Sequence, residues 1–165
     1  MNKDIFTIEQ EKKDFYKFET DVQKILDRWY IKRNHTVDRT GACKEFDCIL
    51  DNDIKVEEKI RDGLFNDILI EIIQDLITFA PGWAITTKSD YIHYVMCFNK
   101  FPLRLYRINW KKFRPWYFDI YLKNNKQGRY IISQRGWGLT LNMLVPINDI
   151  EESCIVEYKL GDVNE

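Results

Sequence analysis

Residues 46–60 read Phe-Asp-Cys-Ile-Leu-Asp-Asn-Asp-Ile-Lys-Val-Glu-Glu-Lys-Ile, and this stretch decides the fold that we predict. Two short segments with apolar residues, 46–50 and 54–61, flank the run Asp51-Asn52-Asp53. Asp and Asn favour tight turns, because their side chains hydrogen-bond to nearby backbone and tolerate left-handed conformations. The pattern therefore predicts a β-hairpin in which the numbers of paired residues sum to about 104.

Three charged side chains of this hairpin indicate metal-dependent chemistry. Side chains alternate between the faces of a strand, so Glu57 and Lys59 project from one face, roughly 6.6–7 Å apart. The expected register places Asp47 opposite Glu57. Two adjacent carboxylates repel each other, and a bound divalent cation removes the repulsion. Mg²⁺ suits such a pair, because it takes one or two carboxylates and fills its other positions with water and phosphate oxygens.

These residue types together predict hydrolysis of phosphodiester bonds. A divalent ion held by Asp47 and Glu57 makes a water easier to deprotonate and withdraws charge from the scissile phosphate. Lys59 would hold or deprotonate the attacking water, or neutralise charge that develops on phosphorus. We expect Mg²⁺ as the cofactor, with Mn²⁺ able to replace it.

The remaining pattern predicts a single α/β domain over residues 1–165. Apolar residues recur at helical spacing between residues 9 and 32, and Asn109 can cap a second helix that breaks at Pro115. Further strands are expected at residues 67–73, 91–98, 103–108, 130–133, 139–145 and 155–158. The order is a helix, three strands, a short crossover, two strands, a helix and more strands, which is typical of a mixed α/β sandwich.

Composition limits the location and the partners. No apolar run approaches the roughly 18–20 residues of a membrane span, and the N-terminus lacks the apolar stretch of a signal peptide, so we expect a cytoplasmic protein without membrane contact. The cysteines are scattered, with no C-x-x-C pair and no nearby histidine, and are expected to be free and mostly buried. They are Cys43, Cys48, Cys97 and Cys154.

The net charge of −1 hides an asymmetry, because residues 100–135 hold ten basic residues and one acid, Asp119. A basic segment beside an acidic one is compatible with a cation site next to a phosphate-binding surface. The predicted phosphate contacts are Lys111, Lys112, Arg114, Arg129 and Arg135. The alternative is a solvated face of a core helix, and we favour the core for the aromatic residues interleaved there.

The arrangement of Asp47, then ten residues later Glu57-x-Lys59, on adjacent strands behind an N-terminal helix, resembles the PD-(D/E)XK nuclease superfamily. That group includes restriction endonucleases and Holliday-junction resolvases. The resemblance covers most of the chain, and residues 82–91 and 144–147 resemble stretches of small, phage-type members. It implies a restriction endonuclease-like fold, a mixed β-sheet core flanked by helices in the order α-β-β-β-(α)-β-β-α-β. It also implies a catalytic Glu19 that points from the first helix into the site, with Asp21 or Glu9 as the alternative inward acid.

Some residues depart from that family's pattern or extend it. Phe46 replaces a proline, and Glu58 occupies a position that is usually apolar, so that face of the strand must be wet or paired. Glu71 and Gln74 are further candidates for positions near the metal, and His93 is expected in the core.

The resemblance favours a DNA endonuclease, including one for structured or branched DNA. A homodimer is compatible with cutting two strands. The alternatives are a nuclease-fold protein that binds nucleic acid or protein without cutting, such as a mobile-element inhibitor, and an unrelated α/β scaffold with a salt-bridged sheet surface.

Overall fold

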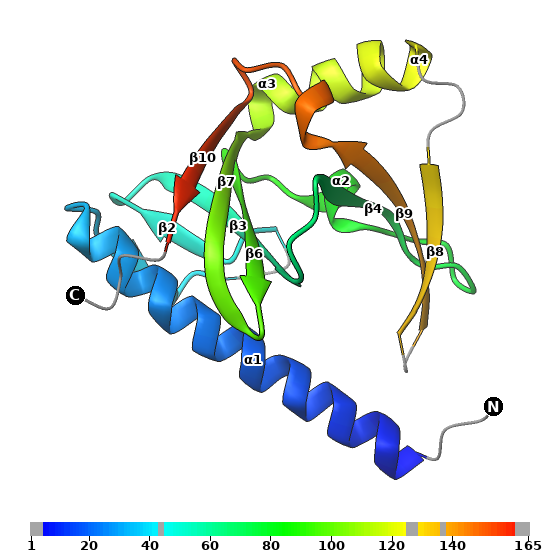
Figure 1. Cartoon of the computed structure of the whole chain (residues 1–165), viewed down its shortest axis with the longest axis horizontal. Coiled ribbons are helices and arrows are strands. Elements are labelled where there is room, and N and C mark those ends of the chain that lie inside the picture. The colour runs from blue at the N-terminus through cyan, green and yellow to red at the C-terminus, as the bar shows by residue number, and fades with distance from the viewer. Residues whose placement is uncertain (1–4, 43–44, 125–128, 136–137, 161–165) are drawn as a thin grey trace.

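A computed structural model of the chain describes residues 5–42, 45–124, 129–135 and 138–160, which form two β-sheets and several helices (Figure 1). The six-stranded sheet contains, in spatial order, β1 (Val37–Asp38), β2 (Cys48–Leu50), β3 (Ile54–Asp62), β6 (Tyr91–Phe98), β7 (Phe101–Asn109) and β10 (Ile155–Lys159). The four-stranded sheet contains β5 (Ala80–Pro81), β4 (Asp67–Asp75), β9 (Gly138–Pro146) and β8 (Arg129–Arg135). The α/β class and the mixed sheet are therefore confirmed.

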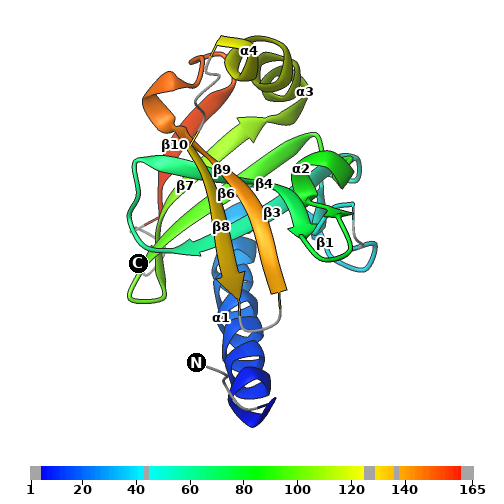
Figure 2. The same ribbon diagram turned by 90° about the vertical axis from the view of Figure 1, so that its right-hand side faces the viewer.

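Helix α1 (Ile5–Lys32) covers one face of the six-stranded sheet. Its apolar stripe, which includes Val22, Leu26 and Trp29, is buried against sheet residues such as Val95 and Leu105. The helix begins four residues before the predicted start, since residues 5–8 contain no proline or glycine that would stop it. Its N-terminal turns extend beyond the sheets (Figure 2).

The hairpin has the predicted register. Cys48 pairs with Val56 and Leu50 with Ile54, so the numbers of the paired residues sum to 104. Asp51 and Asn52 have φ values of 54° and 73°, and the N–H of Asp53 donates to the carbonyl of Leu50. Asp51, Asn52 and Asp53 thus form a three-residue connection between Leu50 and Ile54, and Asp and Asn adopt the left-handed conformation at low cost.

The strand predicted at residues 67–73 exists as β4, but it pairs with β9 in the second sheet, and β6 lies parallel to β3 instead. The physical reason lies in the burial of the two strands. Residues 92–97 of β6 are buried on both faces, as the central strand of a covered sheet must be. In β4 the fully buried residues are Ile68 and Ile70, while the alternate residues Leu69 and Glu71 are partly exposed. Gly63, with φ of 137°, turns the chain from β3 toward β4.

The helical segment between β7 and β8 closes the space between the two sheets (Figures 1 and 2). It consists of α3 (Trp110–Pro115), the π-helix η1 (Trp116–Tyr121) and α4 (Leu122–Asn124). The side chain of Asn109 accepts a hydrogen bond from the N–H of Lys112, and the hydrogen-bond pattern changes after Pro115, so the predicted cap and break are confirmed. The aromatic residues of this segment are core residues, as favoured from sequence: Trp110, Phe113, Trp116, Tyr117 and Tyr121.

Other sequence expectations can be compared directly with the structure. Cys48, Cys97 and Cys154 are free and buried, as predicted, whereas Cys43 lies outside the described residues. His93 is a core residue with 3% of its surface exposed. None of the helices in the described part of the chain has the length and apolar character needed to cross a bilayer.

The short helix α2 (Trp83–Thr86) approaches β4 closely at Gly82. A Cβ atom at this position would collide with the backbone carbonyl of Glu71, and backbone cannot move aside as a flexible side chain can. We therefore expect Gly82→Ala to lower the free energy of unfolding by about 1–3 kcal/mol, measured by urea denaturation. Gly138→Ala is the matched control, because a Cβ atom there meets nothing within 4 Å. Equal stabilities of the two variants would contradict the close approach.

Candidate active site

The site begins at Asp47, the residue that immediately precedes β2. The backbone N–H of Asp47 donates to the carbonyl of Val56 at 2.8 Å, which extends the hairpin pairing by one residue. The next bond to β3 comes from a side chain, because the N–H of Glu58 donates to Oδ2 of Asp47 at 2.6 Å. The carboxylate of Asp47 is thus held against β3 at the point where this edge of the strand loses its partner.

Glu57 and Lys59 lie on the face of β3 that looks toward the four-stranded sheet. They pair with Ile92 and Tyr94 of β6, whose side chains belong to the core between the two sheets. Lys59 forms an ion pair with Glu57, and its Nζ lies 5.5 Å from the ring centroid of Trp83. The hydroxyl of Thr87, which donates to the carbonyl of Glu45 at 2.9 Å, also lies near enough to Glu57 to lower its pKa. The structure therefore brings two of the predicted catalytic side chains into direct contact.

Electrostatics connect Asp47 to this pair. Burial raises the pKa of Glu57 above its usual range, and the charge of Asp47 raises it further, while Lys59 and Thr87 oppose the shift. Glu57 is only 6% exposed. Burial and the charge of Asp47 thus outweigh the ion pair with Lys59, and ionising Glu57 is less favourable in the folded protein than in water. This is the electrostatic state that the sequence predicts for a cation site.

The donor set fits Mg²⁺ as a site of two carboxylates. Mg²⁺ keeps several waters and needs only one or two protein carboxylates, so Asp47 and Glu57 are sufficient as ligands. A larger cage is not present, because the described residues contain no group of three or more His, Cys, Asp or Glu side chains that would hold a metal.

The opposite face of β3 carries a buried polar network around Glu58, whose pKa is raised by burial. Arg39 donates from Nη1 to one Glu58 oxygen and from Nη2 to the other, both at 3.0 Å, and it also binds Asp27 of α1. The hydroxyl of Tyr30 donates to Glu58 at 3.0 Å and lies 2.6 Å from Nδ1 of His93. The expectation that Glu58, at a usually apolar position, would be wet or paired is therefore confirmed, because it is paired. The sequence did not identify Arg39 as its partner.

His93 contributes a neutral side chain to this network. Burial, together with the charges of Arg107 and His35, lowers its pKa to about 3, so the imidazole carries no charge near pH 7. Its Nε2 has no hydrogen-bond partner among the residues that the structure describes. The position favours a structural role over a catalytic one.

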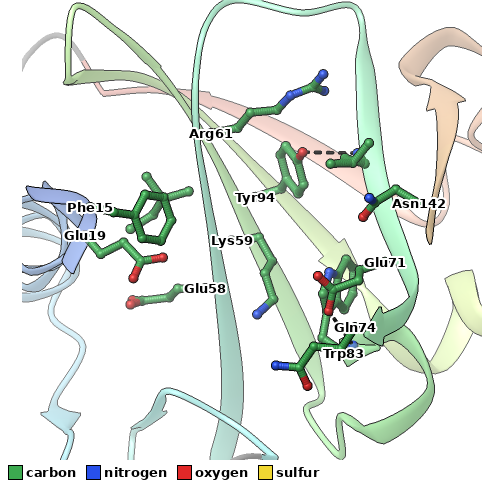
Figure 3. A pocket seen from close by; sticks show the side chains of 12 residues that line it. Phe15, Glu19, Glu58, Lys59, Arg61, Glu71, Gln74, Trp83, Tyr94 and Asn142 are labelled. Atoms are coloured by element: carbon green, nitrogen blue, oxygen red, sulfur yellow. Dashed lines mark hydrogen bonds between the residues drawn. The ribbon is translucent and has the colours of Figure 1, made fainter. Parts of the chain in front are cut away.

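A groove straddles the free edge of β3 beyond Asp47, and we call it the β3 groove (Figure 3). It has a volume of about 230 Å³. Glu19 lines it from α1, as Phe15 does, and Figure 3 shows Glu19 turned toward Glu58. Glu19 therefore shares the groove with Lys59 but approaches from the opposite side of the strand. Glu71 and Gln74 line the groove on the side of β4.

The structure describes the side chains of three of the five predicted phosphate contacts, Lys111, Lys112 and Arg114. Lys111 is exposed and forms an ion pair with Asp90 at 2.7 Å, and Asp90 in turn accepts a hydrogen bond from the backbone of Lys55 in β3. The start of α3 thus lies beside the N-terminal end of β3. Lys112 and Arg114 are exposed on the same helix. Arg129 and Arg135 begin and end β8, and their side chains lie outside the described part of the structure.

No protein-family model matches the chain, and a comparison with curated proteins found no similar sequence. The assignment of the site therefore rests on its own residues and their geometry.

The pair of Arg39 and Glu58 is expected to be a major determinant of stability. Arg39→Met leaves a buried carboxylate without its cation, which typically costs about 3–5 kcal/mol of unfolding free energy, measured by urea denaturation. Adding Glu58→Leu should recover most of the loss, since an apolar pair of similar volume is often as stable as the ion pair. Lys24→Met, which removes the exposed ion pair with Asp21, should cost less than about 1 kcal/mol. A loss in Arg39→Met no greater than in this control would contradict the network.

The raised pKa of Glu57 has a consequence for stability. The folded protein holds the Glu57 proton more tightly than the unfolded chain does, so the free energy of unfolding falls as pH rises through the interval between the two pKa values. Without divalent metal, Glu57→Gln should therefore raise the melting temperature at pH 8 by about 2–4 °C, equivalent to about 1 kcal/mol. The gain should vanish below about pH 4, where the unfolded glutamic acid is also protonated.

Glu152→Gln is the control for this measurement, because Glu152 is exposed and remote from β3. Thermal scans of the three proteins at pH 4, 6 and 8 make the comparison. A Glu57→Gln protein that melts below the wild type at pH 8 would show that the ionised carboxylate stabilises the fold.

Proposed function

We propose that the protein is a Mg²⁺-dependent phosphodiesterase, and specifically a deoxyribonuclease that cuts within DNA. The observation that carries the proposal is that buried Glu57 is ion-paired with Lys59 and has its pKa raised by Asp47, which the N–H of Glu58 holds against β3. Buried carboxylates with a raised pKa, whose ionisation lowers the stability of the fold, are typical of catalytic and binding centres. The resemblance to PD-(D/E)XK nucleases supports the same reaction class and a restriction endonuclease-like fold.

Each residue of the site has a role in this proposal. Asp47 and Glu57 are the ligands of the divalent ion, which when bound lowers the pKa of a water and withdraws charge from the phosphate. The N–H of Glu58 fixes Asp47 in place before the ion arrives. The ammonium of Lys59 holds the attacking water by a hydrogen bond, or neutralises charge that develops on the phosphate in the transition state. Glu19 is an additional acid, which lines the β3 groove from α1, across the strand from Lys59.

The start of α3 supplies the contact with the nucleic-acid backbone. Lys111, Lys112 and Arg114 are exposed there, and the ion pair of Lys111 with Asp90 connects this surface to β3. Exposed lysine and arginine side chains contribute sequence-independent, salt-dependent affinity for phosphates. Arg129 and Arg135 extend the proposed contact, and a homodimer would let two such sites cut both strands of a duplex.

The test of this proposal is a cleavage assay with the full chain on supercoiled plasmid, linear duplex, single-stranded and four-way DNA. The wild type should cut at least one form in Mg²⁺ or Mn²⁺ and none in EDTA. Lys59→Met should lose about 10²–10³-fold in rate, the usual effect of removing one transition-state contact. Lys24→Met, an exposed lysine ion-paired on α1, is the matched control and should retain full activity.

The outcome also separates the enzyme from a non-cutting binder. DNA binding without cleavage of any form would favour the binder and overturn the enzymatic proposal, as would a Lys59→Met protein that cuts at the wild-type rate.

A further inference from the structure

The β3 groove is lined by polar and aromatic side chains that the proposed metal-dependent hydrolysis does not use. Beyond Asp47, no described strand pairs with the free edge of β3, so the carbonyl of Glu58 and the N–H and C=O of Ile60 face the groove. α1 forms one wall, and β4, β9 and α2 form the other (Figure 3). Lys59 lines the groove and contacts Glu57, so any group inside it lies next to the proposed catalytic centre.

The charge of the groove disfavours a phosphate inside it. Glu19 and Glu71 line it with carboxylates, whereas Glu58, which also lines it, is ion-paired with Arg39. Its two cationic side chains already have acidic partners, since Lys59 binds Glu57 and Arg61 binds Asp67 at 2.6 Å. Like charges close together in a half-enclosed site are costly. A ligand that enters should therefore be uncharged and should offer hydrogen-bond donors to the carboxylates.

Two side chains on the wall formed by β4 and β9 end in amides, a group that recognises nucleic-acid bases by hydrogen bonds. Asn142 is only 2% exposed, and its amide nitrogen is fixed by hydrogen bonds to Thr140 Oγ1 at 2.7 Å and Ser133 Oγ at 3.2 Å. Figure 3 shows its amide turned toward the middle of the groove, which Asn142 lines from β9. Gln74 presents a second amide. Asparagine and glutamine amides recognise the amino group of adenine, and glutamate accepts from that of cytosine.

A ring surface completes this wall. Trp83 lines the groove, and its ring packs against Trp110 with the ring centroids 5.6 Å apart, while its backbone N–H donates to Glu71 at 3.4 Å. Aromatic side chains bind unpaired bases by stacking, with little dependence on sequence.

We propose that the β3 groove receives one unpaired base of the substrate strand, and that the substrate class is DNA with an unpaired nucleotide next to the scissile phosphate. The inference rests on the proposed function and narrows it. A base in a continuous duplex is stacked and paired, and it reaches a recess of about 230 Å³ only when it leaves the helix. An unpaired base avoids that cost, which makes bulges, flaps and single strands the preferred substrates.

The experiment measures binding by fluorescence anisotropy in EDTA, so that no cleavage occurs. The probes are a fluorescein-labelled continuous duplex and the same duplex with one unpaired adenine or one unpaired thymine. The wild type should bind the adenine bulge roughly tenfold more tightly than the continuous duplex, as one stacked base provides. It should also bind the adenine bulge more tightly than the thymine bulge, because thymine lacks an exocyclic amino group.

Two variants test the groove itself. Gln74→Leu changes an exposed position and Asn142→Leu a buried one, and both should reduce the preference for the bulge to less than about threefold with unchanged affinity for the continuous duplex. Asn148→Leu, an exposed asparagine in η2 (Ile147–Asp149) away from the groove, is the control. Equal binding of bulge and duplex by the wild type, or a preference that both variants keep, would overturn the inference.

The two proposals fail separately. A protein that cuts continuous duplex in Mg²⁺ but shows no bulge preference in EDTA contradicts only the groove. A protein that prefers the bulge but never cuts contradicts only the enzyme.

Discussion

Burial of the Glu58 carboxylate between α1 and the six-stranded sheet constrains the rest of the structure. A buried carboxylate needs a cation and donors, and Arg39 and Tyr30 supply them from the loop and the helix on that side. Because neighbouring residues of a strand point to opposite faces, fixing Glu58 toward α1 forces Glu57 and Lys59 toward the four-stranded sheet. The N–H of the same residue holds Asp47. The buried Glu58 thus determines which face of β3 each side chain occupies, and with it the positions of Asp47, Glu57 and Lys59.

The elements close to one another in sequence were predictable, because local chemistry determines them. The left-handed turn at Asp51 and Asn52 fixes the hairpin register, and the apolar stripe of α1 fixes its buried face. The division into two sheets was not predictable. Alternation in β4 showed that one face is buried, but not which strand lies beside it, and its pairing with β9 joins residues about seventy positions apart along the chain.

The residues of the site divide in the same way, into those placed by local sequence and those placed by long-range packing. Asp47, Glu57 and Lys59 lie on one hairpin, and their neighbourhood follows from register alone. Glu19 was expected to point from the first helix into the site, and it reaches the β3 groove beside Glu58, because the stripe of α1 packs on the face of β3 opposite Glu57. Glu58 at an otherwise apolar position was the one sequence signal of a buried network. Its partner Arg39 sits in a loop without periodicity, so no pattern could identify it.

The central claim is that Asp47 and Glu57 share a divalent ion, which would relieve the unfavourable ionisation of Glu57 that burial and Asp47 produce together. The most direct measurement is anomalous diffraction from crystals of the full chain soaked in Mn²⁺, collected at the manganese edge. The account predicts an anomalous peak within coordination distance, about 2.0–2.3 Å, of one carboxylate oxygen from each of the two residues. Saturating Mn²⁺ that leaves both carboxylates without a peak, with Lys59 still bound to Glu57, would contradict it.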